Sequence, residues 1–561
     1  MFRVIMDFNN LLILICLSCF YLQVYSTYIA GVYEHHLDDQ SRSVEYNLKK
    51  YNSVADDAKK LGVDILVFPE QGIYGNTNIP NRKVLTNFSS YVPNPVQKIS
   101  PCYYNNFSSV LKNLSCLAKQ YEMYIVANIN EKFDCNNITQ KELNDTRDCG
   151  SDKLYFFNTN VAFDRNGTVI ARYRKHNLFG EFLFNTTIVP TISTFNTDFN
   201  VRFGLFTCFD ILFDKPTLML VKNYNIRHVV FPTRWMSELP FLTALQIQEG
   251  WAYVNNATLL ASNVNYPKFG STGSGIYQAR TKNNVYYATG KEESTLIISE
   301  VSKDNRYLPN SKYTYKIYPK FGESILYENK HPPANNNESI SIQMVPYQMN
   351  NYSFMPLQLN KDRIHETVCQ NTVCCEFNVS LSRNTTLMNL NSTNYKYQFV
   401  IRDGVRSFSG MADGGIQSCG IVACTTNNTS SCGLRFPDYN KIDWPVTFEN
   451  ITIRANFPEK KNLIHFPNTV NTSIMPILSS SWSWERKDTN TIVYKLNKPQ
   501  NYLLTFGIFG RNFDFDSSPR GLLSNISDNN SLGFALKACG VLLFATIIFQ
   551  YFYLDIIVFE F

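Results

Sequence analysis

Apolar residues in the first half of the chain follow two alternating patterns. Residues 64–70 (DILVFPE) and 123–131 (MYIVANINE) are short, nearly continuous apolar runs, which are typical of buried strands in a parallel sheet. Ahead of the first run, residues 41–61 place apolar side chains on one helical face, and Gly62 follows as a helix stop. The pattern predicts strands that alternate with covering helices.

The same alternation continues beyond residue 200. RHVVFP (227–232) and TLLASNVN (258–265) read as strands, and Ser237 is expected to cap a helix that runs to about Tyr253. Strands that alternate with helices favour a layered arrangement. We therefore expect one α/β domain over residues 27–315.

The character of the chain changes after residue 315. Proline and asparagine runs at 332–337 are followed by short strand-like pieces such as 396–404, and six cysteines cluster between 369 and 432. This combination predicts a second, mainly β domain over residues 316–514 that is held together by disulfides. Residues 515–531 then read as a linker and attachment region.

The first residues of the chain resemble a targeting segment. Residues 11–22 form a short apolar run behind Arg3, and small residues stand at Val24 and Ser26. This predicts a secretory signal peptide over residues 1–26, cut after Ser26. The run is short for a membrane span, and an uncleaved anchor is the alternative.

A second apolar run extends from residue 532 to 554, behind the small and polar stretch SNISDNNS (524–531). One reading is a GPI-attachment signal whose tail, 532–561, is removed; the other is a single membrane span. No Lys or Arg follows the run, so the usual cytoplasmic positive charge is missing and the GPI anchor is favoured. We expect the protein on the extracellular face of the cell membrane, with secretion as the alternative. The candidate attachment residues are Ser524, Asn525, Ser527, Asp528, Asn529 and Asn530.

Many N-x-S/T tripeptides support passage through the secretory route, where such sites accept glycans. An Asn-rich chain also forms some of them by chance. The candidate glycosylation sites are Asn87, Asn106, Asn113, Asn137, Asn144, Asn166, Asn185, Asn256, Asn337, Asn351, Asn378, Asn384, Asn391, Asn427, Asn450 and Asn471.

Composition and charge exclude one class of partner. The chain is 44% hydrophobic, which is enough for a large core, and its net charge of +6 over 561 residues is weak. No run of Lys or Arg stands out, so nucleic acid is not an expected partner.

The cysteine count is informative in a secreted chain, because cysteines tend to pair in an oxidising compartment. Of the 14 cysteines, two lie in the leader and one in the tail, and two even groups of four and six occupy 102–149 and 369–432. Cys208 is left over. It is either a buried, inert residue or a reactive thiol.

Three polar groups stand at the ends of apolar segments in the α/β half, where such folds place reactive residues. They are Glu70, Lys175 and Cys208. Together they would make a thiol amidohydrolase in which Glu70 is the general base and Cys208 attacks an amide carbonyl to form a thioester. Lys175 and the backbone N–H of Phe209 would stabilise the oxyanion.

Other readings of these residues remain open. Taken singly, Glu70 could cap a neighbouring helix and Lys175 could be one of several solvated bases in RYRKH. A Cys–His hydrolase would need a histidine such as His176 as its base. A non-enzymatic surface protein on the same fold would have little reason to hold all three groups.

The stretches around these groups resemble the signature regions of the nitrilase, or carbon–nitrogen hydrolase, superfamily. They are FPE at 68–70, RYRKHNLF at 172–179 and the segment around Cys208. The fuller stretches VFPEQGIYG, CFDILF and VFPTRWMSELP are similar to the vanin and biotinidase branch. The similarity runs from about residue 28 into the second domain.

This resemblance implies an α-β-β-α sandwich for the first domain. It implies that Glu70, Lys175 and Cys208 form a catalytic triad, with Glu181 as a supporting carboxylate. It also implies hydrolysis of a small-molecule linear secondary amide, with no metal or cofactor. Vanins cleave pantetheine to pantothenate and cysteamine, and biotinidases release biotin from biotinyl-lysine; the GPI-like tail favours the vanin side.

Overall fold

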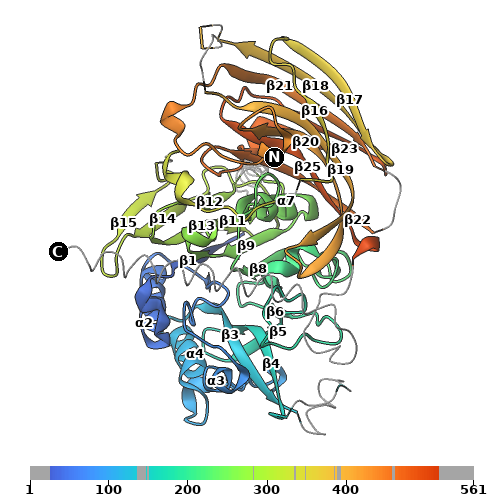
Figure 1. Ribbon diagram of the computed structural model, residues 1–561. Helices are drawn as coiled ribbons and strands as arrows, with labels where there is room; N and C mark the ends of the chain where they lie inside the picture. The colour runs from blue at the N-terminus through green and yellow to red at the C-terminus, as the bar shows by residue number, and fades with distance from the viewer. Residues whose placement is uncertain are drawn as a thin grey trace, which may run out of the picture. The chain divides into compact units, whose positions relative to one another are not determined.

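Figure 1 shows the structure of the protein, which is a computed structural model. The described ranges are 26–135, 147, 151–281, 283–333, 336–347, 349–384, 386–387, 393–457 and 462–516. The predicted leader, the tail with its attachment residues, and Asn137, Asn144 and Asn391 lie outside them. In the described part of the chain, no helix is long and apolar enough to cross a membrane.

Two sheets form the centre of the first domain. The first sheet has nine strands: β15 (Ile325–Glu328), β14 (Tyr313–Tyr318), β13 (Ser294–Ser302), β1 (Thr27–His36), β2 (Ile65–Val67), β3 (Tyr124–Asp134), β4 (Leu154–Phe163) and β5 (Val169–Arg174), with β10 (Val264–Asn265) beside β1. The second sheet has six strands: β12 (Val285–Tyr287), β11 (Ser274–Gln278), β9 (Thr258–Ser262), β8 (His228–Pro232), β7 (Arg202–Leu205) and β6 (Thr194–Asn196).

Side-chain alternation along the strands explains the layers. In β1, Ala30 and Val32 belong to the core between the two sheets, whereas Tyr33 belongs to the core under the helices. In β2, Val67 and Leu66 divide in the same way. Because successive residues of a strand point to opposite faces, an almost wholly apolar strand is buried on both sides.

Helices cover the outer faces of this double sheet. Helices α2 (Val44–Lys60) and α4 (Ser109–Tyr121) contribute to the core on the outer face of the first sheet, whereas α7 (Ala244–Asn255) packs on the second. In Figure 1 the blue helices α2 and α4 lie on one side of the strands and the green α7 on the other. The expected α-β-β-α sandwich is therefore confirmed. The shorter helices are α3 (Arg82–Asn87) and α6 (Thr217–Lys222).

The predicted start of the helix near residue 237 is wrong. Helix α7 begins at Ala244, and the hydroxyl of Thr243 caps it by accepting from the N–H of Gln246. Ser237 instead lies in the preceding loop, where its hydroxyl accepts a hydrogen bond from the N–H of Ala244. Pro240 stands in that loop and cannot donate a backbone hydrogen bond, so the segment before residue 243 does not join the helix.

Helix α7 also packs against the second domain, through β22 (Leu463–Asn471). A Cβ atom on Gly250 would lie 2.9 Å from the Cβ of Phe466 and 3.0 Å from the carbonyl oxygen of Pro467. Glycine in a helix costs about 1 kcal/mol relative to alanine. Here it permits the close approach of helix and strand that joins the two domains.

The second domain is a sandwich of two antiparallel sheets with one apolar core between them, and it confirms the expected β architecture. One sheet contains β16 (Ser353–Pro356), β19 (Lys396–Phe408), β20 (Ala412–Cys424), β25 (Leu503–Asn512) and β22. The other contains β17 (Arg363–Gln370), β18 (Val373–Arg383), β21 (Val446–Asn456), β24 (Thr491–Leu496) and β23 (Trp482–Arg486).

Disulfides fasten both domains. In the second, Cys375–Cys419 joins the two sheets, Cys369–Cys374 closes the β17–β18 hairpin, and Cys424–Cys432 closes the loop after β20. In the first, Cys102 is bonded to Cys116. Cys208 is a free, buried cysteine, in agreement with the odd count.

The expected boundary between residues 315 and 316 falls inside β14. The first sheet continues through β14 and β15 to Glu328, because β14 pairs along its whole length with β13. The change in composition near residue 316 therefore does not coincide with the end of the sheet.

The candidate glycosylation sites differ in accessibility. Asn185 is 8% exposed, and its side-chain oxygen accepts hydrogen bonds from the N–H of Phe156 and from Arg82. A glycan on Asn185 would not fit this packing. The side chains that are exposed are those of Asn87, Asn106, Asn113, Asn166, Asn256, Asn351, Asn384 and Asn427.

Candidate active site

Three chain segments end beside one another and bring their polar groups together. Glu70 follows β2, Lys175 follows β5 directly, and Cys208 begins a short 3-10 helix, η4 (Cys208–Leu212), just after β7. All three side chains are buried: Glu70 is 2%, Lys175 1% and Cys208 7% exposed. Each group therefore has to be satisfied by its neighbours rather than by bulk water.

Lys175 bridges two carboxylates. Its Nζ lies 2.8 Å from Oε1 of Glu70 and 2.7 Å from Oε1 of Glu181. The side-chain amide of Asn158 donates to the same two oxygens, at 2.8 and 2.6 Å. The second oxygen of Glu70 accepts from the backbone N–H of Arg234 at 2.9 Å.

The turn that carries Cys208 is held in an unusual conformation. Cys208 has a φ of 45°, in the left-handed region that costs a non-glycine residue about 1 kcal/mol or more. Asp210 stabilises the turn, because its carboxylate accepts from the N–H of Thr207 at 3.0 Å and from the hydroxyl of Tyr173 at 2.7 Å. It also accepts from the N–H of Asn177, which ties the turn to the segment after Lys175.

The surroundings favour the ionised form of Glu70 and the neutral form of Cys208. Burial alone would raise the pKa of Glu70, but the Lys175 ammonium and the hydrogen bonds around the carboxylate bring it below its usual value. The nearby thiol of Cys208 also contributes to the lowering of the Glu70 pKa. Burial, together with the charge of Glu70, raises the pKa of that thiol far above its usual value. An ionised carboxylate thus faces a neutral thiol, which is the pairing of a general base with its proton donor.

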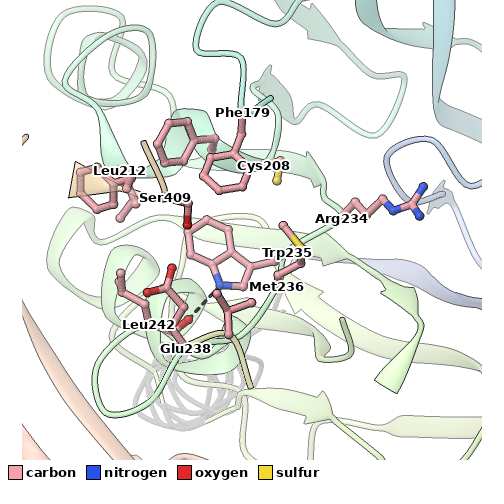
Figure 2. A pocket seen from close by; sticks show the side chains of 12 residues that line it. Phe179, Cys208, Leu212, Arg234, Trp235, Met236, Glu238, Leu242 and Ser409 are labelled. Atoms are coloured by element: carbon pink, nitrogen blue, oxygen red, sulfur yellow. Dashed lines mark hydrogen bonds between the residues drawn. The ribbon is translucent and has the colours of Figure 1, made fainter. Parts of the chain in front are cut away.

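Cys208 lies where two hollows meet. The larger hollow has an empty volume of about 1380 Å³, and its lining combines apolar side chains with the charged and polar groups of Glu70, Gln71, Tyr74, Lys175 and Glu181. We call it the polar hollow after these groups. A smaller, mostly apolar hollow of about 460 Å³ is lined by Phe209, Leu212, Trp235, Leu242 and Phe408, among others (Figure 2). Both hollows are also bordered by Phe179, Arg234 and Met236. An elongated molecule could extend from Cys208 in two directions.

The structure brings together Glu70, Lys175, Glu181 and Cys208, with Phe209 next to the thiol in η4. His176, the alternative base, instead forms a hydrogen bond with the hydroxyl of Thr187 through its Nδ1. Among the described residues, no cluster of three or more His, Cys, Asp or Glu side chains suits a metal ion.

Sequence reasoning missed a ladder of buried asparagines: Asn128 on β3, and Asn158 and Asn160 on β4. The amide of Asn128 donates to both Asn158 and Asn160, at 2.6 and 2.9 Å. The amide of Asn160 donates in turn to the carbonyl of Phe206 and the hydroxyl of Thr207. The signal was present in the sequence, because polar amides interrupt the otherwise apolar runs MYIVANINE and LYFFNTNVAF.

Comparisons with known proteins identify a family for each of the two domains. The family model for carbon-nitrogen hydrolases matches residues 34–265, and the model for the vanin C-terminal domain matches residues 342–516. Among solved structures, an amidase from Nesterenkonia sp. is 16% identical over 51% of this chain and 93% of its own, with a TM-score of 0.35.

Curated relatives are similar along most of the chain. Vanin-like protein 1 of Drosophila melanogaster is 34% identical, over 87% of this chain and 86% of its own length. Pantetheinase of Homo sapiens is 34% identical, over 72% of this chain and 76% of its own length. Biotinidase of Bos taurus is 30% identical, over 88% of this chain and 93% of its own length. On this evidence the chain belongs to the vanin and biotinidase branch of the carbon–nitrogen hydrolases, enzymes that hydrolyse carbon–nitrogen bonds other than peptide bonds in linear amides.

Proposed function

We propose that this protein is a thiol amidohydrolase that cleaves a linear secondary amide through Glu70, Lys175 and Cys208. The observation that carries the proposal is the buried contact of Lys175 Nζ with Glu70 Oε1, at 2.8 Å, beside the free thiol of Cys208. A buried lysine, a carboxylate and a lone thiol in one place supply an electrophile, a base and a nucleophile.

Acylation begins when the sulfur of Cys208 attacks the amide carbonyl carbon and its proton passes to Glu70. The carbon–sulfur bond forms, and the carbonyl oxygen becomes an oxyanion. Lys175 and the N–H of Phe209, which begins η4 with Cys208, stabilise that charge. The carbon–nitrogen bond then breaks, and the proton on Glu70 moves to the departing amine, leaving a thioester.

Deacylation uses the same groups in the opposite order. Glu70 is again ionised and takes a proton from a water molecule, whose oxygen attacks the thioester carbon. The carbon–sulfur bond breaks, and the thiolate of Cys208 regains the proton from Glu70. The acid is released, and the resting pair of ionised carboxylate and neutral thiol is restored.

We propose pantetheine, which yields pantothenate and cysteamine, as the substrate, and a biotinyl amide as the second candidate. Relatives named pantetheinase are 30–34% identical to this chain and relatives named biotinidase 30–32%, so both names support an amide with a small acyl group. The disulfides and these relatives agree with an extracellular protein.

We also propose that a GPI anchor holds the protein on the cell surface. The support is the apolar run 532–554 behind the small, polar residues 524–531. An anchor at the end of the linker would leave both domains outside the cell, where the disulfides are stable.

The test is a substrate panel on the full chain expressed in eukaryotic cells and purified. Wild type should hydrolyse pantetheine at least tenfold faster than biotinyl-lysine. Cys208→Ala should abolish turnover, and Glu70→Gln should lower acylation at least about a thousandfold, because the amide cannot accept the thiol proton. Both variants should keep the thermal unfolding temperature of wild type.

Two outcomes would contradict the mechanism. Turnover by Glu70→Gln within tenfold of wild type would mean that another group is the base. Retained turnover by Cys208→Ala would exclude a thioester. Faster release of biotin than of cysteamine would instead select the second substrate.

A further inference from the structure

The apolar hollow beside Cys208 is not built by the first domain alone. Its lining includes Phe408 and Ser409, which stand at the tip of the hairpin formed by β19 and β20 in the second domain. Phe408 is 2% exposed and meets Phe209, the neighbour of Cys208, edge to face at a centroid distance of 5.6 Å. A strand from residue 396 onward therefore reaches the side of the reacting sulfur.

The hairpin tip is a tight turn with a fixed position. Ser409 and Gly410 both adopt left-handed conformations, with φ of 52° and 74°, and the N–H of Met411 donates to the carbonyl of Phe408 at 2.9 Å. A Cβ atom on Gly180 would lie 3.5 Å from the sulfur of Met411. The tip thus rests on the loop that carries Glu181.

Phe408 and Ser409 form one wall of the apolar hollow. Two buried arginines of the second domain hold this wall against the first domain. Arg406 forms an ion pair with Glu238, which lines the same hollow, and its guanidinium lies 5.0 Å from the ring centre of Phe408. Arg511, which is fully buried, donates to the carbonyl of Leu212 at the end of η4 and lies 5.1 Å from the Phe408 ring. Arg511 therefore contacts both Phe408 and the turn that begins at Cys208.

The chemistry assigns the two hollows to the two halves of the amide. Glu70 must hand its proton to the departing nitrogen, so the amine half has to lie on the side of Glu70. Glu70 lines the polar hollow and not the apolar one. The acyl half, whose carbon is bonded to Cys208 in the thioester, is then directed into the apolar hollow.

We propose that Phe408 of the second domain is a specificity-determining residue that sets the length of the acyl group admitted beside Cys208. This rests on the proposed function, since it takes the thioester at Cys208 as given. The favoured acyl group has an apolar portion that packs between Phe408, Phe209 and Trp235. The second domain is thereby part of the substrate site.

The experiment uses the full chain and a series of N-acyl cysteamines with linear acyl groups from acetyl to decanoyl. In wild type, kcat/KM should rise about fourfold for each methylene that is buried, up to the length that fills the hollow, and then fall. Phe408→Ala should move the maximum to chains at least two methylenes longer, mainly through KM. Phe408→Trp should move it to shorter chains.

Two matched variants separate the hollows. Val405→Ala changes an exposed side chain of the same strand and should leave the acyl profile unchanged. Phe182→Ala removes an aromatic ring from the polar hollow and should change the preference among amines at a fixed acyl group, with the acyl optimum unmoved. If Phe408→Ala does not fold, Phe408→Leu, which keeps a smaller apolar side chain, replaces it in the experiment.

The result that would overturn the inference is an unchanged acyl optimum in folded, active Phe408→Ala, Phe408→Leu and Phe408→Trp. A shift in amine preference instead of acyl preference would overturn it equally, because the two halves would then lie in the opposite hollows. Failure of the proposed function is distinguishable: wild type itself would turn over no member of the series faster than Cys208→Ala.

Discussion

The ammonium of Lys175 lies between two carboxylates that differ in their charge state. The pKa of Glu70 is lowered, whereas burial raises the pKa of Glu181 to about 7, because the Lys175 ammonium offsets only part of the cost and the charge of Glu70 adds to it. Below pH 7 the ammonium therefore balances mainly the negative charge of Glu70. Above it, a second negative charge appears within hydrogen-bond distance of the same nitrogen.

This difference predicts how Glu181→Gln changes the pH profile. In wild type, kcat should fall a few-fold as the pH rises through about 7, because ionised Glu181 opposes the developing oxyanion beside Lys175. The Gln variant does not titrate, so its kcat should stay level from pH 6 to 8. The measurement is kcat at saturating pantetheine across that range. Profiles of equal shape in the two proteins would assign Glu181 no electrostatic role.

At the scale of elements, strands β3 and β4 align the site through their asparagines. The ladder of Asn128, Asn158 and Asn160 connects both carboxylates on one end to the turn of Cys208 on the other. The backbone carbonyl of Asn158 also accepts from the N–H of Lys175 at 2.8 Å. Two adjacent strands thus fix the relative positions of Glu70, Lys175 and Cys208.

Asn158→Ala is expected to act as the loss of a positioning residue. Hydrogen bonds to charged groups contribute about 1.5–3 kcal/mol, so kcat should fall about ten- to a hundredfold, with KM changed less than threefold. Loss of a donor to Glu70 raises the pKa of that carboxyl, so the acidic limb of kcat/KM should move to higher pH. Asn52→Ala, an exposed substitution on α2, is the control. If the acidic limb of kcat/KM did not shift in Asn158→Ala, Asn158 would have only a structural role.

Helix α7 carries a buried carboxyl that makes stability depend on pH. Burial raises the pKa of Glu249 to about 8, against only a hydrogen bond from Asn284 at 3.1 Å. Between pH 4.5 and about 8, the folded protein keeps the carboxyl of Glu249 protonated, whereas the unfolded chain, with a pKa of 4.5, has lost that proton. The stabilisation is complete below pH 4.5 and is lost as the pH rises through about 8.

Glu249→Gln should therefore flatten the dependence of stability on pH. The free energy of unfolding of wild type should fall by up to about 1.4 kcal/mol per pH unit between pH 5 and 8 from this group, and the variant should lack that slope. Denaturant titrations of both proteins at pH 5, 6.5 and 8 measure the difference. Parallel curves would mean that Glu249 is not protonated in the folded protein.

At the scale of the whole molecule, anchoring is tested on intact cells. Phosphatidylinositol-specific phospholipase C should release the protein into the medium, because a GPI signal removes the apolar tail and leaves a lipid as the sole attachment. An antibody to residues 556–561 should not label the mature protein. A protein that stays on the membrane and still carries this epitope would have a transmembrane tail.

The sequence by itself determined the architecture and the list of reactive groups. Apolar runs such as 64–70 can be stable only when buried on both faces, so the layered α/β domain followed from local pattern. The odd cysteine singled out Cys208 because pairing in an oxidising compartment depends on number as well as position. Glu70 and Lys175 stood out because they end apolar segments, and their catalytic roles remain predictions.

Only the tertiary structure decided what those groups can do. The contact of Lys175 with Glu70 joins residues 105 positions apart, and its contact with Glu181 joins residues 6 positions apart. Spacing along the chain does not encode which of these groups meet. Phe408 reaches the site from the second domain because the β19–β20 hairpin packs over η4, which no local pattern in either segment predicts. The start of α7 is different, because Pro240 and the capping box formed by Thr243 and Gln246 are local signals that favour Thr243 over Ser237 as the cap. Local pattern sets which faces must be buried, whereas the energy of burial and ion pairing depends on partners that only the fold supplies.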